Sequence, residues 1–431
     1  MKKSTFLVRV SVLLSLLLAT LPTQSVYAAN LVVNTAVDER TTNGKCSLRE
    51  AIINANNNNQ SGSTDCASGM GIDPITFAAN YTITLAGELP IVTSEIVING
   101  KGAAKTIIQA STCNPVTLPG GCTPATYRVF EVYITGNLTL NGLTVRHGRC
   151  GGTCTGNGDR GGGIHSAGGS LTLTNSTISG NSATDAGGGI STGGPLAVTN
   201  STISRNSAPT GGGIFIVDND LNLMSSTISG NSAELGGGLF TAAGFDENNV
   251  FIINSIFSGN HAINSGGGIY NRNFLTVLDS TLSGNSAKNG GGIYNYNAHH
   301  LEVIRSTLSG NDAAMGGGIY NDGNLSIGNS TLSGNEAYDY GGGIYSDGSA
   351  SIYNSTIVFN TLIEGTNLGA GGIDGNVALY NSLVAGNIRL LTSEYRDCSG
   401  TIYFGWIFAG EAAATVSRHA AVGVYNNFAS C

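Results

Sequence analysis

The sequence predicts an all-β protein built as a single-stranded parallel β-helix, a solenoid in which short strands stack coil upon coil. The string NSTISGNSA at residues 175–183 is the first of nine related copies, whose closing Asn recurs every 24 to 29 residues. Between the copies lies a second block, GGGI or a near match. A repeat of about 25 residues with short β-branched runs between Gly, Asn and Ser is typical of one β-helix coil with about three strands. Many Gly, Ser, Thr and Asn in each unit disfavour a helical repeat.

The repeat predicts which positions face the core. Apolar and polar residues alternate in Leu171–Thr174 and in Thr177–Ser179, so each strand has one inward face, and a turn is expected at Asn175–Ser176. Stacking turns each repeat position into a column along the axis. The expected core column is Ile178, Ile203, Ile228, Phe257, Leu282, Leu308, Leu332, Ile357 and Val384. The closing Asn is expected to form a structural ladder and to adopt the left-handed backbone of a tight turn. The Gly runs are expected at sharp corners.

The N-terminus predicts export. A basic start, an apolar run at Val10–Leu18 and the small-residue site Val26-Tyr27-Ala28 are typical of a secretory signal peptide. No other stretch is long enough to span a membrane as a helix, so no transmembrane segment is expected in the mature chain. We divide the chain into a signal peptide (1–28), an N-terminal cap with irregular first coils (29–135), the β-helix repeats (136–387) and a C-terminal tail (388–431).

The cap region should contain one short helix. Ser47 and Glu50 form a capping box, which predicts a helix from about residue 48 to 57 that covers the open end of the solenoid. The expected strands of this region lie around Leu31–Val37, Ile75–Phe77, Ile83–Leu85, Ile96–Ile98 and Thr106–Ile108.

Eight cysteines in an exported chain predict disulfides. Pairing of neighbours gives Cys46 with Cys66, Cys113 with Cys122, Cys150 with Cys154, and Cys398 with Cys431. A metal site at His147, Cys150 and Cys154 is the less favoured alternative. The formal charge of −8 disfavours nucleic acid and anionic lipid as partners.

Two motifs resemble known families. Cys46–Ala51 reads CSLREA, the signature of the bacterial CSLREA-domain proteins, and the GGGI and Ile-x-x-Asn blocks of residues 161–387 resemble the GGAI and FxxN repeats of polymorphic outer membrane proteins. Only Phe257–Asn260 matches FxxN literally. The resemblance implies an exported, surface-associated, right-handed β-helix, in the chlamydial relatives an adhesin carried by an autotransporter barrel. This chain departs from them in having too few residues after Asn387 for a barrel.

The end of the chain resembles an anchor segment only in part. Asn381–Asn387 and Asp397–Thr401 resemble the start of the variable-anchor segment of CSLREA proteins, whereas Trp406 and the Ala-rich stretch 409–421 do not continue it. We therefore expect a truncation or a change of frame near residue 402, and the anchoring route stays open.

An aromatic stripe follows the GGGI blocks. The next position varies between coils, so it should face outward, and six consecutive coils carry a ring there. The residues are Phe215, Phe240, Tyr270, Tyr294, Tyr320 and Tyr345, with His165 and Ser191 before them and Asp374 after them. An exposed row of rings could contact a glycan or a cell-surface protein. Aromatic packing along the sheet or under a loop is the alternative that we favour.

Two further sets of residues have weaker claims to function. A second outward row, of which Thr177 and Ser179 are the first pair, resembles the faces of ice-binding β-helices, although β-propensity explains it equally well. Carboxylates at equal register are Asp159 with Asp185, Asp312 with Glu336, and Asp322 with Asp347. Such pairs could hold Ca²⁺ or serve as acid and base.

The sequence therefore favours an exported, non-enzymatic protein for adhesion or cell-surface structural display, located outside the cell or at the outer membrane. The alternative is a secreted polysaccharide lyase or glycoside hydrolase, because pectin and pectate lyases share the β-helix fold. We expect no catalytic or cofactor-binding residue and no cofactor, with Ca²⁺ as the one candidate. Ligand, oligomeric state and catalytic activity stay open.

Overall fold

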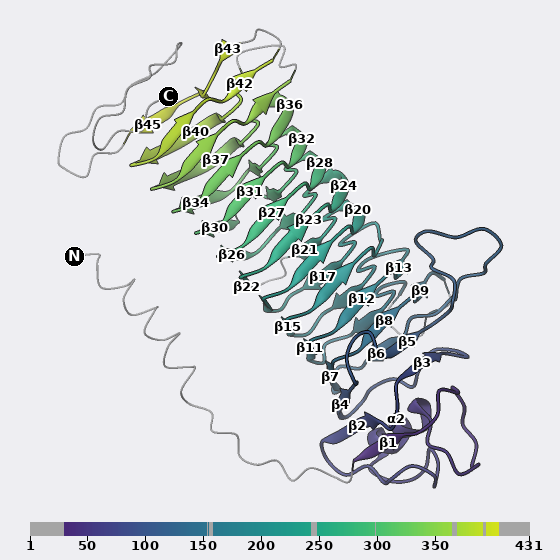
Figure 1. Ribbon diagram of the computed structural model, residues 1–431. Coiled ribbons are helices and arrows are strands. Elements are labelled where there is room, and N and C mark those ends of the chain that lie inside the picture. Colours follow the sequence, from purple (N-terminus) through teal and green to yellow (C-terminus); the bar gives the residue numbers. More distant parts are fainter. Residues whose placement is uncertain are drawn as a thin grey trace, which may run out of the picture.

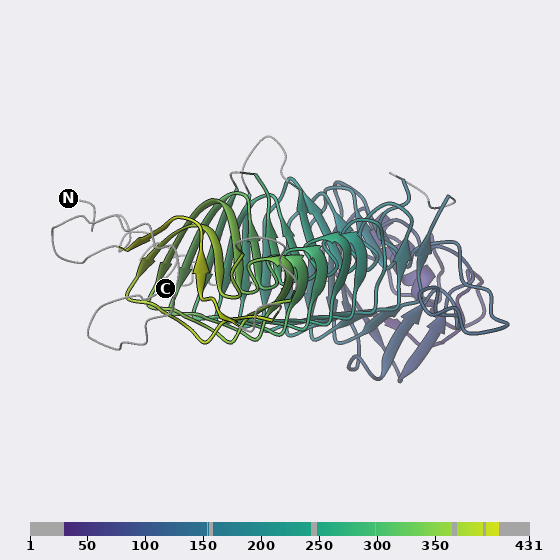
Figure 2. The ribbon, with the colours of Figure 1, turned by 90° about the horizontal axis from the view of Figure 1, so that it is seen from above.

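The computed structural model describes residues 30–152, 154, 158–242, 248–297, 299–363, 369–390 and 394–404. Parallel coils stack along one axis into a rod, with the N-terminal segment at one end and the last coils at the other (Figure 1). Figure 2 shows the same rod from above, with the purple N-terminal segment at one end of the stack. The fold is the predicted all-β parallel solenoid with one helix among the described residues. The expected signal peptide lies outside the described residues.

One wide sheet of 23 strands contains two columns of strands. The first column, which follows the Gly blocks, is β6 (Phe130–Val132), β10 (Ile164–Ser166), β14 (Ile190–Thr192), β17 (Ile214–Val217), β21 (Leu239–Ala242), β25 (Ile269–Asn271), β29 (Ile293–Asn295), β33 (Ile319–Asn321), β37 (Ile344–Tyr353), β40 (Ile373–Tyr380) and β44 (Cys398–Ser399). The second column is β1 (Leu31–Val33), β2 (Asp73–Phe77), β4 (Glu95–Asn99), β7 (Asn137–Asn141), β11 (Leu171–Thr174), β15 (Leu196–Thr199), β18 (Leu221–Met224), β22 (Asn249–Ile253), β26 (Phe274–Leu278), β30 (His300–Ile304), β34 (Asn324–Gly328), the second halves of β37 and β40, and β45 (Ile402–Phe404).

Two narrower faces complete the coils, and the second of them begins only at Arg149. A sheet of 12 strands consists of β3 (Tyr81–Thr84), β5 (Thr106–Gln109), β8 (Thr144–Arg146), β12 (Thr177–Ser179), β16 (Thr202–Ser204), β19 (Thr227–Ser229), β23 (Ile256–Ser258), β27 (Thr281–Ser283), β31 (Thr307–Ser309), β35 (Thr331–Ser333), β38 (Thr356–Val358) and β41 (Leu383–Ala385). The third face consists of β9 (Arg149–Cys150), β13 (Ser182–Ala183), β20 (Ser232–Leu235), β24 (His261–Ser265), β28 (Ser286–Asn289), β32 (Asp312–Met315), β36 (Glu336–Tyr340), β39 (Thr361–Leu362), β42 (Ile388–Arg389) and β43 (Glu394–Tyr395). Only the pair β42–β43 is antiparallel among the described strands.

The core is one continuous apolar cluster from Leu31 to Ile402. It contains the whole predicted core column, of which Ile178, Phe257 and Leu308 are 0% exposed. Every coil therefore buries its apolar residues against equivalent residues of the coils above and below, and this burial is the main source of stability.

The closing Asn residues form the predicted ladder. Asn181, Asn206 and Asn231 are each at most 1% exposed. Nδ2 of Asn181 donates to Oδ1 of Asn206, and Nδ2 of Asn206 donates to Oδ1 of Asn231, both at 3.0 Å. The same Oδ1 of Asn206 also accepts the backbone N–H of Asn181, at 3.0 Å. Nδ2 of Asn206 also donates its second hydrogen bond to the carbonyl oxygen of Ile178, at 3.1 Å. The amide therefore uses both its donors and both its acceptor positions inside the core.

The left-handed backbone is not at the closing Asn, which corrects that part of the prediction. It falls on the preceding residue, Gly180 in one coil (φ +62°) and Arg205 in the next (φ +55°). It also falls at the turn predicted at Asn175, whose φ is +52°.

The Gly blocks form corners that touch the next coil. Gly187, the first of its block, has φ +65°. A Cβ on Gly188 would lie 2.5 Å from the backbone N and O of Ser207. The corner therefore needs Gly for close approach as well as for backbone freedom.

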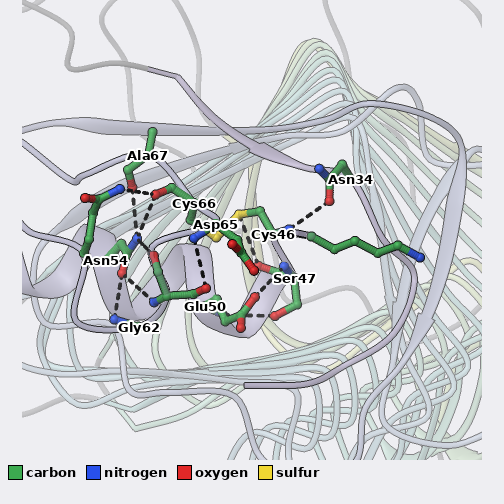
Figure 3. The surroundings of a disulfide bond; sticks show 12 residues. Asn34, Cys46, Ser47, Glu50, Asn54, Gly62, Asp65, Cys66 and Ala67 are labelled. Carbon is green, nitrogen blue, oxygen red and sulfur yellow. Dashed lines mark hydrogen bonds between the residues drawn. A yellow bond between two sulfur atoms is a disulfide. The ribbon is translucent and has the colours of Figure 1, made fainter. Parts of the chain in front are cut away.

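The N-terminal helix α2 (Leu48–Asn57) has the predicted bounds and capping box. The backbone N–H of Glu50 donates to Oγ of Ser47 at 3.2 Å, and the backbone N–H of Ser47 donates to Oε2 of Glu50 at 2.9 Å. Figure 3 shows this box beside the Cys46–Cys66 disulfide. The side chain of Asn54 holds the loop that follows, through the carbonyl of Ala67 at 3.0 Å. The helix packs on β1, β2 and β4 and so covers the end of the solenoid.

Candidate functional site

The aromatic stripe is a single column on the outer face of the first strand column. Parallel pairing places Phe215 opposite Phe240, Phe240 opposite Tyr270, and Tyr270 opposite Tyr294. The same register continues from Tyr294 to Tyr320 and from Tyr320 to Tyr345. The inward neighbour of each ring is a core Ile or Leu, so the alternation of the strand directs the rings away from the core.

The rings stack on one another along the rod. Their centroids are 5.6 Å apart for Phe215 and Phe240, and 4.7 Å apart for Phe240 and Tyr270. From Tyr270 to Tyr294 the distance is 5.0 Å, and from Tyr294 to Tyr320 it is 4.8 Å. From Phe215 to Tyr294 the rings are stacked, with interplanar angles of 15° to 25°, so each covers the flat face of its neighbour and stacking of a sugar there is disfavoured. Tyr320 is instead tilted by 30° against Tyr294 and by 59° against Tyr345.

The outward rings are less exposed than we expected. Phe215 and Tyr270 are 8% exposed and Phe240 is 5% exposed, and they form a second apolar cluster with Ala186. The expectation of an exposed row is wrong for these three, because Leu235 of the third face packs beside them. Tyr294, Tyr320 and Tyr345 are half-buried. The accessible part of the stripe is therefore its C-terminal half.

An aspartate organises the hydroxyls of that half. Asp347 accepts hydrogen bonds from the hydroxyl of Tyr320 at 3.1 Å and from that of Tyr345 at 2.8 Å. Burial and this carboxylate raise the pKa of both phenols well above the usual range. Burial also raises the pKa of Tyr270 to about 12. These tyrosines are neutral hydrogen-bonding groups at physiological pH.

A charged cluster at the other end of the column was missed in the sequence. Glu131 and His165 occupy the same register as the rings, and Ser191 separates them from Phe215. Arg128 is 0% exposed and makes an ion pair with Glu131. Burial lowers the pKa of Arg128 to about 10, and burial with the nearby Arg128 lowers that of His165 to about 4.

The signal for this cluster was present in the sequence. Phe130 pairs with Ile164, so residues 127–130 lie in register with the first GGGI block. Their sequence is Tyr-Arg-Val-Phe, where the repeats have Gly-Gly-Gly-Ile. A bulky, charged corner in place of three glycines marks the coil at which the third face begins.

The carboxylate pairs are largely occupied by protein partners. Asp312 pairs in register with Glu336, and burial raises the pKa of Asp312. Asp185 accepts from Arg160 at 2.6 Å. Asp347 is bound by the two tyrosine hydroxyls described above. Within the described residues, no group of three or more His, Cys, Asp or Glu side chains is arranged to hold a metal ion.

Three predicted disulfides are present: Cys46–Cys66, Cys113–Cys122 and Cys150–Cys154. The alternative metal site that used Cys150 and Cys154 is therefore wrong. Cys431, the expected partner of Cys398, lies outside the described residues, as do Trp406 and the stretch 409–421. The disulfides indicate an extracytoplasmic protein.

The second outward row lies on the 12-stranded sheet. Thr177 and Ser179 are half-buried on either side of the core residue Ile178, and Thr202 and Ser204 stand in register with them. The row is a regular polar face, and an ice-binding role for it stays a prediction.

Comparison with known proteins supports the repeat resemblance. Residues 254–272 and 279–296 match the family model of the Chlamydia polymorphic membrane protein (Chlamydia_PMP) repeat. No curated protein and no solved structure gives a significant match. No helix of the described segments is long and apolar enough to cross a membrane. The chain therefore combines repeats similar to those of a membrane-protein family with a parallel β-solenoid, and the CSLREA resemblance stays an interpretation.

Proposed function

We propose that this protein is an exported, non-enzymatic rod that is held at a cell surface and displays side chains for adhesion or structural contact. The observation that supports this most is the continuity of its columns. The same core, amide and aromatic positions recur from coil to coil, and two of the three carboxylate pairs are engaged by Arg160 or by tyrosine hydroxyls. A repeated outer surface suits a display scaffold, whereas catalysis needs one site of unique residues.

The contact surface of this proposal is the half-buried part of the stripe, Tyr294, Tyr320 and Tyr345 with Asp347. Its ring edges, hydroxyls and carboxylate offer apolar contact beside hydrogen-bonding groups, a combination common in protein interfaces. Because the planes of Tyr320 and Tyr345 are tilted by 59° against each other, these rings form no flat platform for a sugar, and we favour a cell-surface protein over a glycan as the partner.

Fractionation of producing cells tests the location. An antibody to residues 161–387 should detect the processed protein on the surface after a high-salt wash. Release of all the protein into the medium would contradict the display proposal. It would lead to assays for new unsaturated or reducing ends on glycans in the presence of Ca²⁺, which test the lyase and hydrolase alternative.

Substitution tests the contact surface. The double variant Tyr294→Ala/Tyr320→Ala should lower attachment to target cells at least tenfold. The matched control is Tyr353→Ala/Tyr380→Ala, which removes another stacked pair, with centroids 4.6 Å apart, from the second strand column. Equal attachment by both variants would show that the stripe is packing alone.

A further inference from the structure

The Cys150–Cys154 disulfide has a cationic neighbour. Nη2 of Arg128 lies 3.1 Å from Sγ of Cys150 and donates to the carbonyl of Gly158 at 2.9 Å. The ion pair with Glu131 holds the other side of the guanidinium, and Arg128 is fully buried. The positive charge is therefore fixed beside one of the two sulfur-bearing residues.

The two cysteines of this disulfide differ in access. Cys150 is 0% exposed, whereas Cys154 is partly exposed. In the Cys46–Cys66 disulfide both residues are at most 2% exposed. The Cys113–Cys122 disulfide has one buried and one partly exposed cysteine, but no guanidinium in the described structure donates to either. Both disulfides therefore join a buried to a partly exposed cysteine, and they differ in the guanidinium and in sequence separation, which is 4 for Cys150–Cys154 and 9 for Cys113–Cys122.

We propose that Cys150–Cys154 is a thiol-exchange site, at which a low-molecular-weight thiolate attacks Sγ of Cys154 and Cys150 leaves. The attack forms a bond between the incoming sulfur and Sγ of Cys154, and the Cys150–Cys154 bond breaks. Its electron pair goes to Sγ of Cys150, which becomes a thiolate beside Arg128. A second thiolate then attacks the mixed disulfide on Cys154, and Cys154 leaves as a thiolate that takes a proton from solvent.

The guanidinium favours this direction of attack. A neighbouring Arg lowers the pKa of a cysteine thiol, and a leaving thiol of lower pKa departs faster. Attack on Cys150 is disfavoured because that residue has no exposed surface. The positive charge stabilises the thiolate that forms on Cys150, and we expect it to speed opening roughly tenfold. Arg128 acts here as a positioning and electrostatic residue, independently of the proposed display function.

The test uses the oxidised full-length protein with reduced glutathione in excess. Samples are quenched in acid at intervals, denatured and alkylated, and each disulfide is then followed by peptide mass spectrometry. We expect Cys150–Cys154 to open roughly ten times faster than Cys113–Cys122, and Cys46–Cys66 to open last, with glutathione found on Cys154 and not on Cys150. An equal or slower opening of Cys150–Cys154 would overturn the proposal.

A variant isolates the charge. Arg128→Met/Glu131→Gln removes the cation together with its buried carboxylate partner, while the second carboxylate near Arg128, that of Glu88 at 3.5 Å from Nε, is partly exposed to solvent. The ratio of the two opening rates, measured within one molecule, should fall about tenfold. If this variant does not fold, the wild-type ratio and the site of glutathione attachment still decide the proposal. An unchanged ratio in a folded variant would show that the charge of Arg128 does not speed the opening of Cys150–Cys154.

Discussion

The described part of the N-terminal cap (30–135) and the repeat region (136–387) satisfy their buried polar groups in different ways. The cap uses unlike partners: the buried Arg128 pairs with Glu131, and Arg49 pairs with Asp38 at 2.7 Å. The repeat region uses like partners, since buried Asn bonds to Asn and buried Ser to Ser from coil to coil. The ion pairs described in the repeats, such as Arg305 with Asp279, are on the surface.

Translational symmetry explains the difference. In a stack of coils each side chain meets a copy of itself, so a charge would meet a like charge, whereas an amide or hydroxyl both donates and accepts. The end of the ladder shows the same rule. Asn387 donates from its backbone N–H and from Nδ2 to Oδ1 of Asp397, both at 2.8 Å. An ionised carboxylate only accepts, so it can end a ladder but not continue one.

The largest expected effect comes from breaking an unlike pair in the cap. Arg128→Met leaves the Glu131 carboxylate buried without its partner and should lower the free energy of unfolding by about 4 kcal/mol. Arg128→Met/Glu131→Gln should recover most of this loss. Urea unfolding of both variants measures the difference, and equal losses would show that packing of the Arg128 side chain, not charge, stabilises the cap.

Breaking a like pair in the repeats should cost less. Asn285→Ala leaves the backbone N–H and the Nδ2 of Asn260 without their acceptor, both inside the core. Each unsatisfied donor costs about 1–3 kcal/mol, so we expect a loss of about 3 kcal/mol in urea unfolding. The control in the same coil is Ser283→Ala on the outer face, with an effect within about 0.5 kcal/mol. Similar losses for both variants would contradict a structural ladder.

These two regions also differ in how much of them could be predicted. In the repeats, periodicity identifies the core column and the Asn ladder, because each position is sampled nine times. In the cap, the bounds of α2 followed from local capping rules, and the disulfides Cys46–Cys66 and Cys113–Cys122 from neighbouring cysteines. The Arg128 cluster did not follow, because its members occur once and come together only in the folded chain. The burial of Phe215 agrees with the favoured interpretation of the stripe as aromatic packing, whereas the sequence did not show which side chains of other strands, such as Leu235, pack against its cluster.

Substitution of Asp397, which ends the Asn ladder, should change stability less than Asn285→Ala does. Asp397→Ala removes the acceptor of two donors on Asn387 and should destabilise the last coil by about 2 kcal/mol, whereas Asp397→Asn keeps an acceptor and should stay close to wild type. Amide hydrogen exchange at Asn387, with Asn231 in the middle of the rod as the internal reference, measures this local change. Unchanged protection in Asp397→Ala would mean that other contacts close the stack.

The smallest effect at neutral pH is that of His165, which becomes visible only in acid. Burial and Arg128 lower its pKa to about 4 in the folded protein, against an ordinary value of 6.5. The folded state therefore disfavours protonation, and the stability that is fully present above pH 6.5 is lost as the pH falls through 4. Between pH 7 and 4.5 this loss should reach about 2 kcal/mol. In His165→Phe, which places another ring in the column, the difference between the two pH values should shrink by that amount in urea unfolding. An equal loss of stability in acid in the variant would contradict this assignment. The acid sensitivity would then come from carboxylates and not from His165.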